Sequence, residues 1–196
     1  MEVTRVNRRT ASVDTEFSTR EADGKRYIEG YFAVFNSFYE LWDGAAETID
    51  QGAFDLGRDT DVRALANHDT TLVLGRTTAG TLTLSVDERG LYGVVELNEA
   101  DQDAVNLYER VKRRDVTQCS FGFDILDDLP IEENGRTVWH LRSVKLYEVS
   151  VCTFPAYEET GVQARKNELE TIKNARDEEI KAIFELCYFS FLRRQY

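Results

Sequence analysis

The chain has 196 residues, of which 42% are hydrophobic and 11% aromatic, so it can bury one well-packed domain and is not disordered throughout. Asp and Glu number 36 against 24 Lys and Arg, and the net charge of -12 would repel the phosphates of nucleic acids and anionic lipids. No stretch resembles a signal peptide or approaches the roughly 20 apolar residues of a membrane span, so we expect a soluble cytoplasmic protein that binds neither nucleic acid nor membrane.

The chain opens with a polar segment and continues into a strand. Residues 1–24 are charged and show no sustained alternation, which predicts a flexible arm. The run YIEGYFAVF at residues 27–35 is rich in aromatic and β-branched side chains, and it predicts the first strand of a domain over residues 25–163. Residues 36–55 mix aromatics with Gly and Asp, which predicts a loop with a short strand near residues 47–50.

Alternating side chains predict the strands in the middle of this domain. The segment DVRALAN, residues 61–67, would form a strand that delivers His68 to its end, where a side chain can face a cleft. TLTLSV at residues 81–86 and LYGVVEL at residues 91–97 are joined by the short link DERG and predict a β-hairpin. The apolar spacing then becomes helical, which predicts a helix over residues 101–114.

After this helix the period of two returns in the segment VTQCSFGFDIL. The predicted strand has Cys119, Phe121, Phe123 and Ile125 on one face, and Ser120, Gly122 and Asp124 on the other. The segment DDLPIEENGRTV contains Pro130 and the turn pair Asn134-Gly135, so it predicts a loop or hairpin tip before two further strands, TVWHLRS and VKLYEVSVCTF.

Residues 164–196 differ in kind from the domain and predict a helical tail. Its apolar stripe consists of Leu169, Ile172, Ile180 and Ile183. The apolar end of the tail, FELCYFSFL, should pack on the domain or on a second copy of the chain in a homo-oligomer. The three cysteines of the chain, which cannot all pair within it and are therefore expected to be reduced thiols, are Cys119, Cys152 and Cys187.

The sequence can supply the groups of a serine hydrolase. A serine nucleophile needs a base that takes its proton and a third group that orients the base. His68 is better placed for a cleft than His140, the other histidine of the chain. Ser120 lies on a strand with an apolar opposite face, and Gly122 beside it leaves room for a substrate backbone. Spacing alone is more typical of a turn histidine and of a solvent-facing strand serine.

Glu148 interrupts an apolar strand, where an unpaired buried carboxylate would be costly. It can orient His68 as the third member of a triad, form an ion pair with Arg142 or Lys145, or be exposed on an edge strand. The other candidates for the third position are Asp69 and His140. Of these Asp69 is disfavoured, because immediate neighbours on a strand point to opposite faces.

Other site chemistries lack their sequence signatures. Two histidines and three scattered cysteines fit neither HExxH nor a cysteine-rich ligand pattern. GxSxG, GxGxxG and phosphate-binding loops are also missing from the sequence. We therefore predict neither a metal nor a cofactor, and neither an α/β-hydrolase nor a nucleotide-binding fold.

Several blocks in order along the chain resemble the caudovirus prohead protease family over residues 27–163. These blocks are GYFAVFN, IDQGAFD, ALANHD, VLGRT, GLYGVVEL, CSFGF and LYEVSVCTFPAY. One such block is a weak signal, whereas their order together is specific. The resemblance assigns His68 of the NHD block and Ser120 of the SFGF block as the catalytic pair, with Glu148 of the EVS block as the third member.

This resemblance implies a serine endopeptidase that processes the major capsid protein or scaffold inside the assembling prohead, in the cytoplasm of the bacterial host, and that cuts itself in many relatives. It also implies a fold similar to the herpesvirus assemblin proteases: β-rich α+β, with a closed or nearly closed β-barrel and a few flanking helices. Backbone amides are expected to stabilise the oxyanion. Two alternatives stay open, namely a catalytically silent capsid-assembly or scaffold module of the same fold, and a stand-alone esterase or amidase that uses the same serine.

Overall fold

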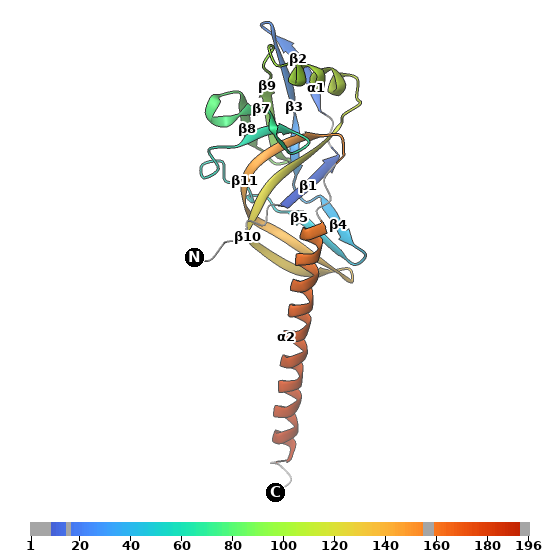
Figure 1. Ribbon diagram of the computed structural model, residues 1–196. Helices are drawn as coiled ribbons and strands as arrows, with labels where there is room; N and C mark the ends of the chain where they lie inside the picture. Colours follow the sequence, from blue (N-terminus) through green and yellow to red (C-terminus); the bar gives the residue numbers. More distant parts are fainter. Residues whose placement is uncertain (1–8, 15–16, 155–158, 193–196) are drawn as a thin grey trace. The chain divides into compact units, whose positions relative to one another are not determined.

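The structure is a computed structural model that describes residues 9–14, 17–154 and 159–192 (Figure 1). The chain divides into two units, Met1–Tyr157 and Glu158–Tyr196. The division comes slightly earlier in the chain than the predicted border between domain and tail at residue 163.

Strands dominate the first unit, so the predicted β-rich α+β class is confirmed. In the described residues its strands are β1 (Arg9–Asp14), β2 (Ser18–Ala22), β3 (Lys25–Val34), β4 (Phe38–Trp42), β5 (Ala45–Ile49), β6 (Arg63–Ala66), β7 (Asp69–Arg76), β8 (Leu82–Val86), β9 (Gly90–Glu96), β10 (Gln118–Glu133) and β11 (Arg136–Cys152). Its helices are the 3-10 helix η1 (Thr77–Ala79) and α1 (Gln102–Lys112).

The strands form two sheets. One has seven strands, ordered β1-β10-β11-β5-β4, with β6 pairing to both β11 and β7. The other has four strands, ordered β2-β3-β9-β8. Among the described residues, the last strand of neither sheet pairs with its first strand, so the expected closed barrel is not confirmed.

The long hairpin of β10 and β11 organises the larger sheet and appears as a pair of curved ribbons in Figure 1. Of the predicted loop or hairpin tip, the hairpin tip is confirmed, because β10 runs through Pro130 to a tight turn at Asn134-Gly135. Proline lacks an N–H group and is tolerated at a sheet edge. Pro130 meets this condition, since the described residues of β1 pair with residues 118–123 of β10 and not with Pro130. The two strands predicted after the turn are one continuous strand, β11.

The predicted flexible arm contains two strands, so that expectation is wrong for its described part. β1 pairs antiparallel with β10, and β2 pairs antiparallel with β3. The side chains of β2 are exposed or half-buried, which explains the polar sequence. A strand at a sheet edge gains backbone hydrogen bonds without needing an apolar face, and alternation cannot reveal it.

The other strongly patterned elements form as predicted. β3 carries a register shift between Tyr31 and Ala33, and β8 and β9 form the expected hairpin. In α1 the Asp101 side chain accepts hydrogen bonds from the first turn, and the apolar stripe is buried. The residues of that stripe are Ala104, Leu107, Tyr108 and Val111. The predicted loop over residues 36–55 instead contains both β4 and β5.

The core lies on the apolar face of β10. Cys119, Phe121 and Phe123 have no exposed surface. The rings of Phe121 and Phe123 stack with centroids 4.8 Å apart, and Phe54 packs edge-on against Phe121. The opposite face of the same strand therefore carries Ser120, as the alternation predicted.

The second unit contains the predicted tail helix, α2 (Glu159–Leu192). Ile180 and Ile183 in its apolar stripe are exposed. The side chains of its apolar end, Cys187 among them, lie outside the described residues, so the predicted packing of that end stays a prediction. Cys119 and Cys152 are buried free thiols. In the part of the chain that the structure describes, no helix is long and apolar enough to cross a membrane.

Candidate active site

His68 lies at the tip of a tight hairpin between β6 and β7. Asn67 and His68 have φ angles of 51° and 59°, and Ala66 pairs with Asp69 on either side of them. Positive φ at both central residues is the signature of a type I′ turn, which asparagine tolerates well. The predicted strand before His68 is confirmed, whereas strand β7 after it was not predicted.

Three hydrogen bonds tie this turn to β11 and to Thr153, the residue that follows it. The backbone N–H of Asn67 donates to the Val151 carbonyl at 3.0 Å, and the side-chain oxygen of Asn67 accepts from the N–H of Thr153 at 2.8 Å. The backbone N–H of His68 donates to Ser150 Oγ at 3.2 Å. The position of the imidazole is therefore set by β11 and not by the hairpin alone.

The imidazole of His68 contacts Glu148, with 2.7 Å between Nδ1 and Oε1. Glu148 is buried, with only 5% of its surface exposed. Of the partners that the sequence left open for Glu148, the structure selects His68. Arg142 instead pairs with Asp127 at 2.9 Å, and Lys145 lies over the ring of Tyr147.

This contact determines which nitrogen of His68 carries the hydrogen. An ionised carboxylate can only accept hydrogen bonds, so Nδ1 of His68 is the donor to Glu148. In the neutral ring Nε2 then has a free lone pair. This is the tautomer that a general base of a serine hydrolase requires.

Ser120 lies on the same face of the sheet as Glu148. In the β10–β11 ladder Ser120 pairs with Ser150, and Gly122 pairs with Glu148. Residues two apart on a strand share a face, and directly opposite residues have Cβ atoms roughly 4.5 to 5.5 Å apart. The ladder and the turn contacts therefore bring His68, Ser120 and Glu148 to one face of the sheet.

The hydroxyl of Ser120 and Nε2 of His68 are both buried and lack a hydrogen-bond partner among the described residues, including each other. Ser120 has no exposed surface, so it is not the solvent-facing serine considered from the sequence. A buried polar atom without a partner costs about 1 to 3 kcal/mol, and a catalytic role is one explanation for such an atom. Here the Ser120 hydroxyl has a hydrogen to donate, and Nε2 of His68 has a lone pair to accept it.

Gly122 makes room for the carboxylate of Glu148. A Cβ atom added at Gly122 would collide with Glu148 Oε1 and would lie 3.0 Å from Glu148 Cγ. The space that the sequence assigned to a substrate backbone at this glycine is thus occupied by Glu148. The expected role of Gly122 is corrected accordingly.

The two alternative third members lie elsewhere or have other partners. Asp69 accepts hydrogen bonds from the backbone and side chain of Thr71, at 2.8 and 2.6 Å. His140 has both ring nitrogens occupied, by Asp50 and Glu133 at 2.8 Å each. Burial lowers the pKa of His140, but the hydrogen bonds to Glu133 and Asp50 outweigh burial and raise it overall. Neither side chain is hydrogen-bonded to His68 in the described structure.

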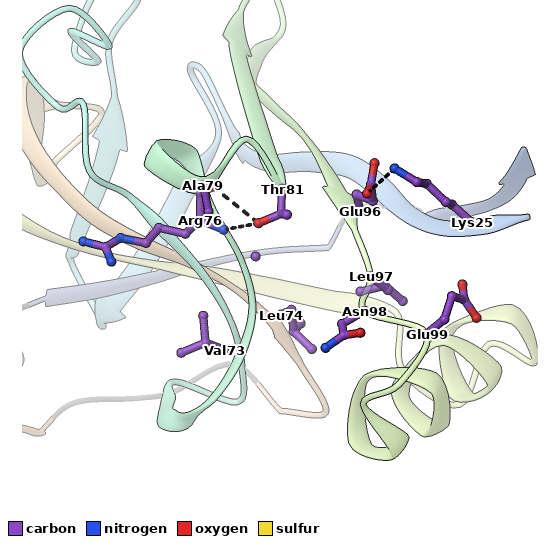
Figure 2. A pocket seen from close by; sticks show the side chains of 11 residues that line it. Lys25, Val73, Leu74, Arg76, Ala79, Thr81, Glu96, Leu97, Asn98 and Glu99 are labelled. Carbon is purple, nitrogen blue, oxygen red and sulfur yellow. Dashed lines mark hydrogen bonds and ion pairs between the residues drawn. The ribbon is translucent and has the colours of Figure 1, made fainter. Parts of the chain in front are cut away.

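A surface pocket of about 530 Å³ lies between β7 and the residues that follow β9. Figure 2 shows Leu74, Leu97 and Asn98 among the side chains that line it, with the Lys25–Glu96 ion pair at one side. The residues that line this pocket do not include His68, Ser120 or Glu148. This pocket is therefore separate from the three residues.

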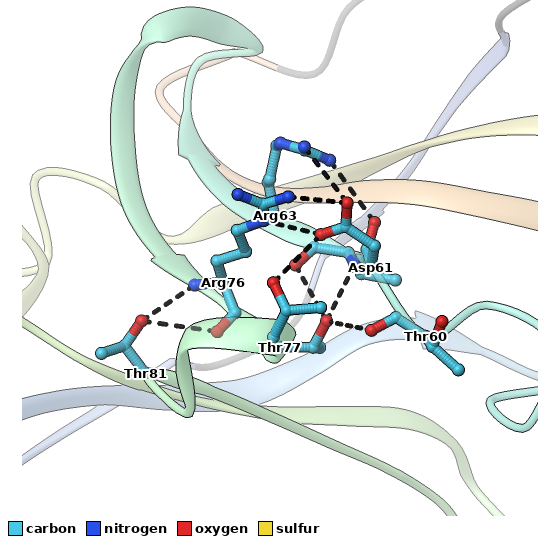
Figure 3. A network of polar contacts seen from close by, with 8 residues as sticks. Thr60, Asp61, Arg63, Arg76, Thr77 and Thr81 are labelled. Carbon is cyan, nitrogen blue, oxygen red and sulfur yellow. Dashed lines mark hydrogen bonds and ion pairs between the residues drawn. The ribbon is translucent and has the colours of Figure 1, made fainter.

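The open end of the β6–β7 hairpin is closed by a charged network (Figure 3). Asp61 accepts from Nε and Nη2 of Arg76 at 2.6 and 2.8 Å, and from Arg63 at 3.3 Å. The hydrogen bonds from Arg76 lower the pKa of Asp61 to about 2, so this carboxylate remains charged at neutral pH. Arg63 and Arg76 form the last pair of the hairpin, so the network fixes its register at the end opposite His68.

Sequence reasoning missed two residues of this site, Asn67 and Ser150. Ser150 has no exposed surface, and its hydroxyl donates to Glu148 Oε2 at 2.6 Å. The alternation that placed Glu148 on one face of its strand places Ser150 on the same face, which was the available signal. For Asn67 the signal was an Asn between two short strands, a typical position for a tight turn.

Comparison with known proteins gives three similarities. A family model described as caudovirus prohead serine protease matches residues 13–175. The prohead protease of Enterobacteria phage HK97 is 33% identical over 177 residues, which cover 87% of this chain and 74% of that protein. The solved structure of the bacteriophage T4 capsid assembly protease, gp21, covers 76% of this chain and 99% of its own, with a TM-score of 0.43 and 13% identity. Similarity at that last level does not by itself establish a shared fold.

Proposed function

This chain belongs to the caudovirus prohead serine protease family, and from that premise we propose that it is a serine endopeptidase in which Ser120 is the nucleophile, His68 the general base and Glu148 the group that orients His68. Its function is that of a protease in phage capsid maturation. The proposed substrates are the major capsid protein and the scaffold, which it cuts inside the assembling prohead.

One observation supports these roles above all others. Glu148 is buried and hydrogen-bonded to Nδ1 of His68, while Nε2 of His68 and Oγ of Ser120 are buried and have no hydrogen-bond partner among the described residues. The first contact orients the base and stabilises its charged form, and the unpartnered atoms are those between which a proton would pass. In unliganded enzymes such catalytic hydrogen bonds are often long and shorten only when substrate binds.

In the proposed reaction Nε2 of His68 takes the Ser120 proton while Oγ attacks the carbonyl carbon of the scissile peptide bond. The tetrahedral intermediate collapses as the imidazolium returns that proton to the leaving amine, so the C–N bond breaks and an acyl-enzyme remains. Water then attacks the ester carbonyl, giving its proton to His68. The Ser120 oxygen leaves with a proton from His68, which restores both groups.

The reaction also requires access to a serine that has no exposed surface. A peptide bond can reach Ser120 Oγ only after the chain that covers this face moves. The side chain of His68 is already 20% exposed, so the proposed base borders the surface from which substrate would enter. We therefore expect substrate binding to be coupled to a local opening beside the β6–β7 hairpin.

Co-expression with the capsid protein of the same phage tests the proposal. We expect the wild-type chain to cut that protein at defined sites, and Ser120→Ala and His68→Ala to abolish the cuts while keeping wild-type circular dichroism and melting behaviour. Intact-mass spectrometry reports both the cut sites and any self-cleavage. Normal cutting by either variant would refute the assigned roles, and uncut capsid protein with the wild type would instead favour a catalytically silent assembly module.

A further inference from the structure

Ser150 occupies the centre of the face that carries the proposed catalytic residues. It has no exposed surface and pairs directly with Ser120 across the β10–β11 ladder. Its hydroxyl donates to Glu148 Oε2 at 2.6 Å and accepts from the backbone N–H of His68 at 3.2 Å. Ser150 is therefore hydrogen-bonded both to the proposed orienting group and to the residue that carries the proposed base.

The two facing serines differ in what their hydroxyls do. The proton of Ser150 is committed to the Glu148 carboxylate, and one of its lone pairs accepts from His68. The hydroxyl of Ser120 has no partner among the described residues. A hydroxyl whose proton is held by a carboxylate is not directed toward Nε2 of His68. The contacts therefore suit Ser150 to hold its neighbours in place and Ser120 to react.

The Glu148 carboxylate needs such a partner. Its last torsion joins a tetrahedral to a planar carbon, and torsions of this type have broad minima. A single hydrogen bond through Oε1 to His68 would leave the carboxylate free to rotate about that bond. The second hydrogen bond, from Ser150 to Oε2, fixes the carboxylate plane and so the direction in which Oε1 meets Nδ1 of His68.

Ser150 also acts on the backbone that carries the imidazole. The N–H of His68 lies at the tip of a turn with positive φ, where the carbonyls of the hairpin ladder do not reach it. Ser150 Oγ supplies an acceptor for this half-buried donor. Loss of the hydroxyl would therefore disturb the imidazole from two directions, through the carboxylate and through the turn.

We propose that Ser150 is a positioning residue of the protease, which acts through Glu148 and the His68 backbone to hold Nε2 of His68 toward Ser120. This inference rests on the proposed function. A displacement of about 1 Å between reacting groups can cost about 100-fold in rate. Because Ser150 does not contact substrate in this scheme, its loss should lower kcat and leave KM unchanged.

The test uses full-length variants and a peptide that spans a capsid cut site found in the co-expression experiment. We expect Ser150→Ala to lower kcat about 10-fold to 100-fold with an unchanged KM. Ser150→Thr and Ser150→Val are matched in size, and only Thr keeps the hydroxyl, so Thr should retain much more activity than Val. Ser143→Ala, on the same strand but outside these contacts, should behave as the wild type.

Each result separates this inference from the function on which it rests. Equal kcat for the wild type and Ser150→Ala, or equal kcat for the Thr and Val variants, overturns the positioning role while leaving Ser120 and His68 untouched. Full activity of Ser120→Ala overturns the proposed function itself. A parallel fall of activity and melting temperature in Ala, Thr and Val alike would show that Ser150 serves folding only, which also overturns the inference.

Discussion

Among single residues, Gly122 has the most direct control over the proposed orienting group. It faces Glu148 across the β10–β11 ladder, and the carboxylate occupies the space where any other residue would have its Cβ. The hydrogen bond of 2.7 Å between Glu148 and His68 thus depends on a missing side chain as well as on the two partners. The unpartnered hydroxyl of Ser120 lies two residues away on the same strand and face.

Replacing Gly122 by Ala should displace the Glu148 carboxylate from His68. We expect a loss of peptide cleavage of about 100-fold, because the base is no longer oriented. Overpacking should also lower the free energy of unfolding by about 1 to 3 kcal/mol. Peptide kinetics and urea unfolding measure the two effects, and circular dichroism at the assay temperature is the control for folding. Wild-type kinetics in a folded Gly122→Ala variant would show that the carboxylate position is not critical.

At the scale of elements, the β6–β7 hairpin delivers the proposed base. Its open end is held by the Asp61 network, and its tip is held by hydrogen bonds to β11 and to Thr153 after it. Asn67 contributes to that tip in two ways. Its backbone adopts the left-handed conformation, and its side-chain oxygen accepts a hydrogen bond from the N–H of Thr153. The backbone and side-chain contributions can be separated by substitution.

Two substitutions at Asn67, to Gly and to Ala, separate the backbone contribution from the side-chain contribution. Asn67→Gly keeps the positive φ without strain but loses the hydrogen bond to Thr153, which should cost about 1 kcal/mol of stability. Asn67→Ala loses the bond and, unlike Gly, keeps a Cβ in the left-handed region without the polar side chain by which Asn tolerates it, so it should be about 1 to 2 kcal/mol less stable than Asn67→Gly. Urea denaturation gives both values. If the Ala variant is as stable as the Gly variant, the turn does not impose the conformation described.

Elements with a strong period were predictable, and those that depend on their neighbours were not. α1 and the β8–β9 hairpin follow from apolar spacing alone. β1 and β2 carry polar sequences and exist because an edge of a sheet is available to them. The sequence around Pro130 left a loop and a hairpin tip open, and the segment is a strand leading to the hairpin tip because, among the described residues, one side of β10 is unpaired there.

The candidate site was predictable to a similar extent. Alternation placed Ser120 opposite the phenylalanines, and burial of Glu148 required a partner. The choice of His68 over Arg142 or Lys145 depended on a contact across 80 positions of sequence, which no local pattern encodes. The closed barrel was expected from the resemblance, and the strand pairing does not confirm it.

At the scale of the whole molecule, all three proposed catalytic residues lie in the first unit, Met1–Tyr157. That unit also contains His140, which joins the end of β10 to the residue after β5 through Glu133 and Asp50. The pKa of His140 is raised in the folded protein, because the two carboxylates outweigh the effect of burial. This raised pKa makes the stability of the fold depend on pH.

His140 should stabilise the fold at low pH and lose that contribution as pH rises. Its stabilisation is fully present below the unfolded pKa of about 6.5 and disappears as pH rises through the raised folded value. We expect the free energy of unfolding of the wild type to fall across this window relative to His140→Gln. Urea denaturation between roughly pH 6 and pH 9 yields both curves. Parallel curves would mean that the carboxylates do not favour protonated His140.

The central claim, that Ser120 is a nucleophile activated by His68, is tested most directly by labelling with an alkyl fluorophosphonate followed by peptide mapping in a mass spectrometer. We predict one adduct on the peptide that carries Ser120, no such adduct in Ser120→Ala, and greatly slowed labelling in His68→Ala. An adduct on Ser150 or another residue in place of Ser120, or unchanged labelling of Ser120 without His68, would contradict the claim.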